Sequence, residues 1–308
     1  MFSELQKKLR PVVFGEVLFD QFDDSLKTLG GAPFNVACHL QGFGANPHFI
    51  SRIGSDESGN SVLRAMSHWN MDTAGVQKDE VMPTGTVHVS LKRGCPSFEI
   101  PAGQAWDSIV FPDQFPCRQS ALLYHGTLAL RSEKNRETVD KIKEMLNPFV
   151  FVDINLRSPW WNHELVMNVF RQASAIKLSI EELKVVLQVP SSIAGEALFD
   201  KARVFFDNRQ LKFIVVTCGS EGAVLLESTG GNITYFNSEP VDEIVDTVGA
   251  GDAFSAVVAL GIINGWRLHD IMKRAGECAA RICSIRGAVV FDNTFYHDLL
   301  LKWGLVGG

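Results

Sequence analysis

The segment DTVGAGDAF, residues 246–254, places a carboxylate directly after a glycine-rich turn. The apolar run AFSAVVALGIING overlaps its end and predicts a helix that begins close to Asp252. The first N–H groups of a helix have no partner within it and, together with the helix dipole, attract an anion. Gly249 and Gly251 allow a tight turn, so the N–H groups of residues 249–252 can converge on one anion. Asp252 would then stand where a carboxylate can accept a hydroxyl proton as a phosphate arrives.

The same residues have a simpler interpretation, in which Asp252 only caps the helix that follows the glycine turn. The segment is not a Walker loop, because neither Gly-Lys-Ser nor Gly-Lys-Thr follows the glycines. Taken alone, the segment leaves both an anion site and a helix cap open.

The rest of the chain alternates between apolar, β-branched segments and helix-like segments, which predicts a parallel sheet with helices on both faces. The predicted strands are residues 11–22, 47–54, 121–126, 148–155, 174–179, 212–219, 222–228 and 232–237. The predicted helices are residues 34–44, 57–70, 131–146, a segment after 161, 181–189, 195–209, 251–264 and 267–285. Residues 84–100 break this rhythm, because polar and apolar residues alternate there around a turn at KRGCP. They predict an antiparallel hairpin, either a lid or a plain edge hairpin.

Composition places the chain among ordinary globular proteins. Of its 308 residues, 46% are hydrophobic and 21% are charged, and the net charge is −6. The sequence contains no apolar run long enough for a membrane span, no basic block of the kind that binds nucleic acid, and no secretory signal in MFSELQKKLR. The six scattered cysteines form no CxxC pair, which predicts reduced thiols. We therefore expect a cytoplasmic protein with one main domain and an inserted lid.

Three segments of the chain resemble the PfkB, or ribokinase-like, family of carbohydrate kinases. GGAPFNVACHLQGFGANPHFISRIGSDESGN (30–60) is similar to the N-terminal signature of that family, DTVGAGDAF to its C-terminal signature, and VTCGSEGAVLL (216–226) to its nucleotide-pocket segment. The resemblance implies an α/β fold of the ribokinase-like type, a three-layer sandwich with a mostly parallel central sheet and a small β-sheet lid. One kinase domain would span residues 1–308, with the lid formed mainly by about 84–111.

The resemblance also implies roles for individual residues. Asp252 would be the catalytic base, and the amides of Gly249, Ala250 and Gly251 would form the anion hole for the transferred phosphate. The residues implied for the sugar are Asp20, Gly30, Gly31, Asn35 and Arg157, and those implied for ATP are Ser179, Thr217, Gly219 and Gly222. Glu182 would orient water around Mg²⁺, and Asp246, with the SIRGA segment (284–288), would bind a monovalent cation such as K⁺.

Several of these residues keep simpler alternatives. Asp20 and the Gly30–Gly31 pair can be turn residues, Asn35 and Ser179 can be helix caps, and Thr217 to Gly222 can be an ordinary β-turn. Asp153, Asn155 and Arg157 match a DxNxR segment of the family, but Arg157 can also make a surface ion pair. Ser179 stands where the family often has Asn, with Lys177 nearby as a possible source of charge. Phe98 and Trp106 are candidates either for stacking on the substrate or for packing.

The implied function is ATP-dependent, Mg²⁺-assisted phosphorylation of a primary hydroxyl on a small sugar. GEVLFD (15–20) and GGAPFNVA (30–37) resemble fructokinases more than ribokinases, so fructose is the expected sugar. Kinases for 2-keto-3-deoxygluconate, ribose or a nucleoside are the alternatives within the family. A non-catalytic sugar-binding regulator is the alternative outside catalysis. Exposed lid strands often pair between subunits, so we expect a homodimer through the lid.

Overall fold

The computed structural model describes residues 10–22, 27–92, 95–112, 115, 120, 122–207, 211–228, 230–241 and 243–306. Its strands are β1 (Val12–Phe14), β2 (Leu18–Gln21), β3 (Lys27–Gly30), β4 (His48–Gly54), β5 (Val76–Asp79), β6 (Gly85–Lys92), β7 (Cys95–Glu99), β8 (Leu122–His125), β9 (Phe149–Asp153), β10 (Ala175–Ser179), β11 (Phe213–Thr217), β12 (Ala223–Glu227) and β13 (Ile233–Phe236). Its α-helices are α1 (Ala32–Gly42), α2 (Glu57–His68), α3 (Glu133–Leu146), α4 (His163–Gln172), α5 (Ile180–Leu187), α6 (Gly195–Phe206), α7 (Ala250–Ile263), α8 (Leu268–Cys283) and α9 (Asn293–Lys302). Short 3₁₀ helices are η2 (Ala105–Ser108), η3 (Leu128–Arg131) and η4 (Gly219–Glu221).

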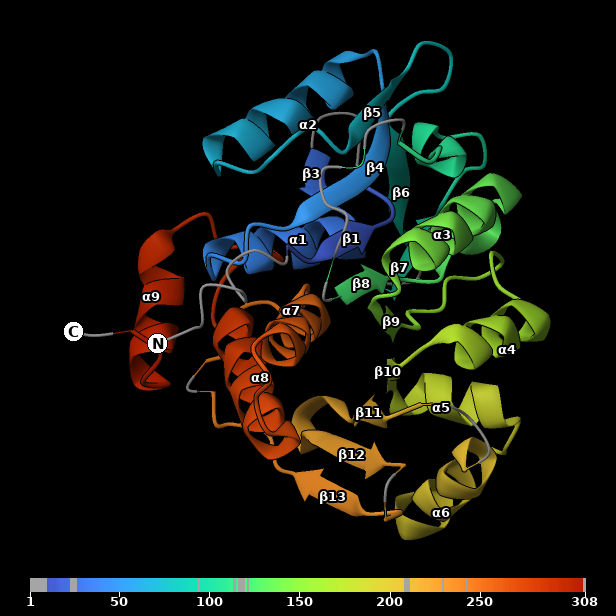
Figure 1. The fold of residues 1–308 in the computed structure, drawn as a ribbon, viewed down its shortest axis with the longest axis vertical. Helices are drawn as coiled ribbons and strands as arrows, with labels where there is room; N and C mark the ends of the chain where they lie inside the picture. The colour runs from blue at the N-terminus through green and yellow to red at the C-terminus, as the bar shows by residue number, and fades with distance from the viewer. Residues whose placement is uncertain are drawn as a thin grey trace.

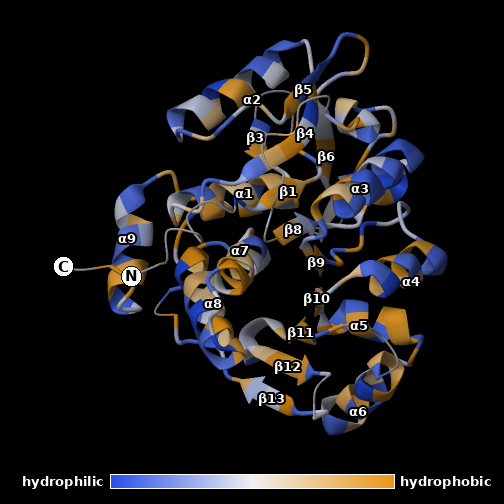
Figure 2. Cartoon of the chain, in the orientation of Figure 1, coloured by the Kyte–Doolittle hydropathy of each residue, from blue (hydrophilic) through white to orange (hydrophobic). Residues whose placement is uncertain are grey.

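A nine-stranded sheet forms the centre of the described part of the chain, in the order β13-β12-β11-β10-β9-β8-β1-β4-β5. Along this order, each pair of neighbours from β11 through β10, β9, β8, β1 and β4 to β5 is parallel. Strand β12 pairs antiparallel with both β11 and β13. Helices α1, α7 and α8 cover one face and α3 to α6 cover the other, as Figure 1 shows. Figure 2 shows mostly hydrophobic strands between helices such as α2 and α3, whose outer sides are hydrophilic. The arrangement confirms the predicted three-layer α/β fold with a mostly parallel sheet.

A separate four-stranded sheet, called the small sheet below, has the order β3-β2-β6-β7. Its strands β6 and β7 form the antiparallel hairpin that the alternating pattern predicted. The prediction of one strand over residues 11–22 is wrong, because β1 ends at Phe14 and β2 begins at Leu18 in the small sheet. Gly15 lies at this break with a φ of +152°, and a Cβ there would lie 2.4 Å from the side chain of Pro33. The small sheet therefore contains two N-terminal strands as well as the hairpin.

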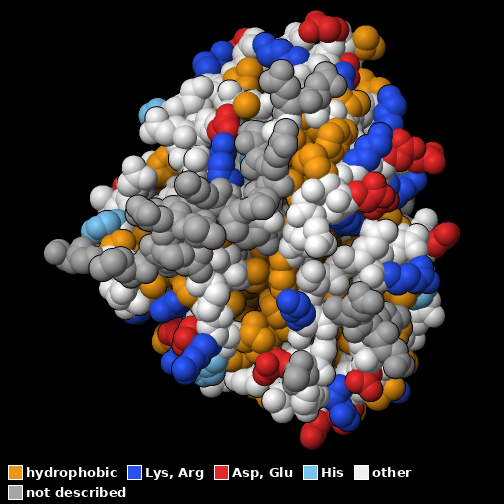
Figure 3. Space-filling view, viewed as in Figure 1, with side chains coloured by type: hydrophobic (Ala, Val, Ile, Leu, Met, Phe, Trp, Pro, Cys, Tyr) orange, Lys and Arg blue, Asp and Glu red, His pale blue; other side chains and the backbone are white. Residues whose placement is uncertain are grey.

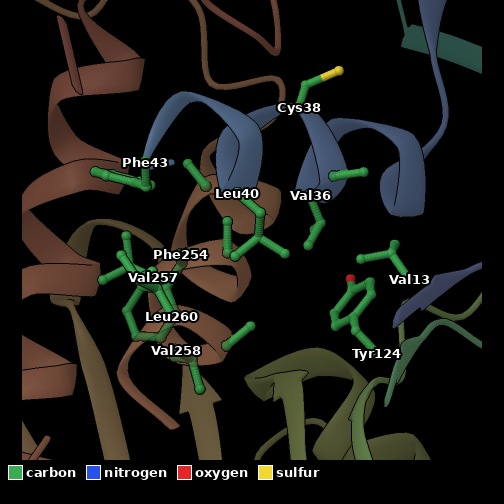
Figure 4. Close-up of a cluster of buried hydrophobic side chains, with 14 of the residues drawn as sticks. Val13, Val36, Cys38, Leu40, Phe43, Tyr124, Phe254, Val257, Val258 and Leu260 are labelled. Carbon is green, nitrogen blue, oxygen red and sulfur yellow. The ribbon is translucent and has the colours of Figure 1, made fainter. Parts of the chain in front are cut away.

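Helix α7 is enclosed on all sides, because every residue from Ala253 to Gly261 is buried. It packs against α1, and Figure 4 shows Leu40 of α1 in one buried cluster with Phe254 and Val257 of α7. Burying a large apolar side chain contributes on the order of 1.5–3 kcal/mol to folding, so several such contacts fix the two helices against each other. This packing brings the first turns of α1 and α7 together, although the sequence separates them widely.

No helix in the described part of the chain has both the length and the apolar character required to cross a membrane. On the face that Figure 3 presents, acidic and basic side chains are intermixed, and apolar side chains are visible near the middle.

Candidate active site

The parallel strands β1, β8, β9, β10 and β11 end at one edge of the main sheet. In open α/β sheets this edge is where ligands bind. Helix α7 begins over the same edge, because Ser255 Oγ donates a hydrogen bond of 2.8 Å to Asp153 Oδ2 at the end of β9. The residues implied by the sequence can therefore be located around a single place in the fold.

Asp252 lies in the first turn of α7 and is held by a residue from the first turn of α1. Asn35 Nδ2 donates a hydrogen bond of 2.7 Å to Asp252 Oδ2 across 217 residues of sequence. Asn35 is buried, so this contact fixes the orientation of the carboxylate. The structure thus joins a residue of the N-terminal signature directly to a residue of the C-terminal one.

The surroundings of Asp252 tune it to accept a proton near neutral pH. The pKa of Asp252 is raised from 3.8 to about 6; burial is the largest cause, and the nearby Asp153 acts in the same direction. The hydrogen bond from Asn35 and the charges of Lys177 and Arg157 act in the opposite direction and lower the pKa. A base whose pKa lies close to the working pH is well matched to general-base catalysis.

The turn before Asp252 contains two glycines that have different roles. Gly249 is the N-cap of α7 with a φ of +81°, and a Cβ there would lie 2.4 Å from Ala288 Cα, so glycine is required for the backbone. Gly251 lies within α7 without a positive φ, and a Cβ there would meet only Lys177 Nζ within contact range, at 3.6 Å. The expectation that Gly251 is needed for a tight turn is therefore wrong. A side chain at this position would instead stand beside Lys177 at the first turn of α7.

A buried ion pair lies beneath this turn. Lys177 Nζ and Asp153 Oδ2 are 2.6 Å apart, and both side chains are less than a tenth exposed. Ser255 Oγ also donates to Asp153 Oδ2, so this carboxylate oxygen accepts from two side chains. The sequence analysis matched Asp153 to a DxNxR segment of the family, and the structure shows that it pairs with Lys177. The pairing of these three residues could not be read from the sequence, because they come from β9, β10 and α7.

The residues implied for the sugar lie where β2 and β3 meet the main sheet. A Cβ at Gly30 would lie 3.4 Å from Asp20 Oδ2, so Asp20 and Gly30 are neighbours. Gly31 has a φ of +105°, and a Cβ there would lie 2.8 Å from the carbonyl oxygen of Glu16. Burial raises the pKa of Asp20, and the charge of Arg157 lowers it. Asp20, Gly30 and Gly31 thus lie close to the first turn of α1, and the charge of the exposed Arg157 reaches Asp20.

The residues implied for the nucleotide lie on the next strands along the edge. Ser179 and Thr217 are aligned neighbours at the ends of β10 and β11. Gly219 and Gly222 have φ values of +57° and +104° in the turn to β12, and a Cβ at Gly222 would lie 2.0 Å from the carbonyl oxygen of Phe236. The turn thus requires glycine at position 222 for packing against β13, independently of any nucleotide.

Ser179 and Glu182 form a capping box at the start of α5, which was the simpler alternative for Ser179. Glu182 Oε2 accepts from Ser179 N at 2.7 Å, and Glu182 Oε1 accepts from Leu156 N at 2.6 Å. Asp246 also binds backbone, since its carboxylate oxygens accept from the N–H groups of Val248 and Gly287 at 3.0 Å each. The roles of Glu182 at Mg²⁺ and of Asp246 at a monovalent cation stay predictions.

Trp106 is a packing residue. Its side chain is fully buried, and Nε1 donates to Gln104 Oε1 at 2.7 Å, so no face is available to stack on a substrate. The side chain of Phe98, the other stacking candidate, lies outside what the structure describes. The sequence analysis did not identify Glu16 or Ser255, both of which are buried near Asp252 or its partners.

The chain is similar to known carbohydrate kinases along most of its length. The family model described as pfkB family carbohydrate kinase matches residues 10–293. Sugar kinase PH1459 of Pyrococcus horikoshii is 30% identical over 281 residues, covering 89% of this chain and 86% of that protein. Its crystal structure in complex with ATP has a TM-score of 0.75 and 27% identity, covering 90% of this chain and 93% of that one.

Fructokinases are among the similar proteins as well. A fructokinase of Klebsiella pneumoniae is 28% identical over 301 residues, covering 90% of this chain and 94% of that protein. A fructokinase double mutant from Vibrio cholerae O395, solved with fructose, ADP and a potassium ion, has a TM-score of 0.79 and 25% identity, covering 94% of this chain and 98% of that one. These likenesses show that the fold is ribokinase-like.

Replacing Asp252 by Asn should remove the proton acceptor with little change in shape. We expect kcat for ATP-dependent sugar phosphorylation to fall by roughly 10²–10⁴-fold, the usual scale for loss of a general base. In the unmodified protein, kcat should fall as the pH drops below about 6, because Asp252 becomes protonated there. Asp270→Asn, an exposed carboxylate in the first turn of α8, is the matched control. Turnover of Asp252→Asn within tenfold of the unmodified protein would exclude the base role.

Replacing Gly251 by Ala should separate folding from anion binding. The added methyl meets no backbone, so the melting temperature should stay within a few degrees of the unmodified value, whereas kcat should fall by about tenfold or more because the methyl stands over the first turn of α7. Gly276→Ala on α8, where a Cβ meets open space, should change neither quantity. Full activity of Gly251→Ala would mean that the phosphate does not approach this turn.

Proposed function

Because the chain belongs to the pfkB family of carbohydrate kinases, we propose that it transfers the γ-phosphoryl group of ATP to a primary hydroxyl of a small sugar, and that this sugar is fructose. The observation that carries the proposal is the hydrogen bond from Asn35 to Asp252. It holds a carboxylate of raised pKa at the start of a helix, where a proton acceptor would lie beside N–H groups that attract an anion.

In the proposed reaction, Asp252 accepts the proton of the attacking hydroxyl. The N–H groups at the start of α7 face the negative charge that develops on the transferred phosphoryl group. Lys177 places a buried positive charge near Gly251, and its ion pair with Asp153 balances that charge. Asp20 and Asn35 would hold hydroxyl groups of the sugar, since a carboxylate accepts and an amide both donates and accepts hydrogen bonds. Arg157 would hold phosphate oxygens or a sugar oxygen.

Metal ions fit this site as companions of the nucleotide. The described residues contain no group of three His, Cys, Asp or Glu side chains that would hold a metal. Mg²⁺ in kinases is held largely by phosphates and water, so Glu182, whose oxygens each accept a backbone N–H, would reach it through water. Bound Mg²⁺ neutralises charge on the phosphates. The potassium ion in the Vibrio fructokinase structure supports a K⁺ role for Asp246.

Fructose is supported by the similarity to fructokinases, at 25–28% identity. 2-Keto-3-deoxygluconate, ribose and nucleosides are the competing acceptors within the family. A non-catalytic sugar-binding regulator is less well supported, because such a protein has no need of a carboxylate with raised pKa at the start of α7. We also propose a homodimer through the small sheet, whose described edge strands are β3 and β7.

The choice of sugar can be tested with a panel of acceptors. Purified protein with ATP and Mg²⁺ should give the highest kcat/KM with fructose, compared with ribose, glucose, adenosine and 2-keto-3-deoxygluconate. A preference of tenfold or more for another acceptor would contradict the fructokinase assignment and leave the kinase assignment intact. ATP binding without phosphorylation of any acceptor would support the regulator instead.

Replacing Asp20 by Ala should weaken sugar binding selectively. Loss of one partner of a buried hydrogen bond typically costs about 1–3 kcal/mol, so the KM for the sugar should rise by roughly ten- to a hundredfold while the KM for ATP stays nearly unchanged. Asp200→Ala on α6, which removes an exposed carboxylate, is the control and should alter neither constant. An equal rise of both KM values would show that Asp20 acts on the fold of the site instead of on the sugar.

A further inference from the structure

Several buried side-chain polar atoms of the described residues have no hydrogen-bond partner. Two of them, Glu16 Oε2 and Arg131 Nη1, belong to an acidic and a basic residue near the ligand-binding edge of the main sheet. Glu16 is 2% exposed, and the side chain of Arg131 is 5% exposed. A buried polar group without a partner costs on the order of 1–3 kcal/mol, and more when it is charged, so each of these two atoms calls for a partner.

The two residues follow neighbouring strands at the ligand-binding edge. Strands β1 and β8 pair in parallel, with Phe14 opposite His125. Glu16 comes two residues after β1, and Arg131 ends η3, the short helix that follows β8. The backbone of Glu16 also abuts Gly31, in the turn implied for the sugar, because a Cβ at Gly31 would lie 2.8 Å from the Glu16 carbonyl oxygen.

The electrostatics place Glu16 among the groups of the candidate active site. The pKa of Glu16 is raised to about 7 by the sum of its surroundings, of which burial is the largest cause. The charges of Arg157 and Arg131 lower this pKa, and the charge of Asp252 raises it. Glu16 therefore lies within electrostatic range of the proposed base and of both arginines.

Arg131 is held rigidly, so its free nitrogen points in a fixed direction. The guanidinium lies between two indole rings, 4.0 Å from the ring centre of Trp106 and 4.2 Å from that of Trp160. Its Nε and Nη2 donate to Asp107 at 2.6 and 2.7 Å, and Nη2 also donates to the Pro101 carbonyl oxygen at 2.7 Å. These contacts leave Nη1 as the donor that remains to be used.

We propose that Glu16 and Arg131 together bind one hydroxyl group of the acceptor sugar, a hydroxyl other than the one that is phosphorylated. A hydroxyl oxygen can accept from Arg131 Nη1 and donate its proton to Glu16 Oε2, which satisfies both unpartnered atoms at once. The inference rests on the proposed sugar kinase function. A water molecule has the same donor and acceptor chemistry, so the experiment has to separate a sugar hydroxyl from a bound water.

A double-mutant-type cycle, in which protein variants are combined with sugar derivatives, distinguishes a bound sugar hydroxyl from a bound water. Derivatives of the preferred sugar, each lacking one hydroxyl, are tested on the unmodified protein and on Glu16→Gln, which keeps the size of the side chain. If the pair binds a sugar hydroxyl, one derivative should lose about 10- to 100-fold in kcat/KM with the unmodified protein but only about twofold with Glu16→Gln. The losses of the other derivatives should be the same with both proteins.

Arg131→Lys gives a second, independent test that keeps the positive charge near Asp107. The derivative whose loss in kcat/KM is reduced by Glu16→Gln should also lose less with Arg131→Lys than with the unmodified protein. The exposed pair Glu57 and Arg64 on α2, whose closest charged atoms are 2.6 Å apart, supplies the matched controls Glu57→Gln and Arg64→Lys, which should leave every loss unchanged. Melting temperatures of all variants show whether the fold is retained.

The inference would be overturned if every derivative lost the same factor in kcat/KM with the unmodified protein, with Glu16→Gln and with Arg131→Lys. Water would then be the partner of the pair. In that case the unmodified protein still phosphorylates the sugar, so the proposed function stands. Absence of phosphorylation of any acceptor by the unmodified protein would instead remove the proposed function, and the inference with it.

Discussion

The contact between Asn35 and Asp252 is the interaction on which the site depends. It joins the first turns of two helices that are 217 residues apart in sequence, and it exists because α1 and α7 pack through a shared apolar cluster. Without that packing, the proposed base would stand alone at a helix start. With it, the carboxylate is oriented toward the sheet edge where the residues implied for the sugar and the nucleotide also lie.

Charge balance is the second constraint. Four carboxylates, Glu16, Asp20, Asp153 and Asp252, gather near this edge. Asp153 is neutralised by Lys177, whereas burial raises the pKa of the other three above the usual range. Arg157 lowers the pKa of each of these three and is the cation common to them. Two of the groups thus titrate near neutral pH, where proton transfer is most readily controlled.

The fold class, the order of most elements and the position of Asp252 at the start of a helix could be predicted from sequence, because each depends on local pattern or on a short motif. The path of the chain after Phe14 could not, because the break at Gly15 depends on the position of the distant Pro33, which leaves no room for a Cβ at residue 15. Nor could the partners of Asp153, since Lys177 and Ser255 lie 24 and 102 residues away in sequence. The sequence also left open whether Trp106 stacks on the substrate or packs in the core. Only the fold shows that its side chain contacts Arg131 and Gln104.

A crystal structure of the protein with fructose and a non-hydrolysable ATP analogue tests the central claim most directly. The account predicts that the acceptor hydroxyl lies within hydrogen-bond distance of Asp252, and that the terminal phosphate meets the N–H groups at the start of α7. A sugar bound away from Asp252, or a terminal phosphate that does not reach the turn at Gly249–Gly251, would contradict it.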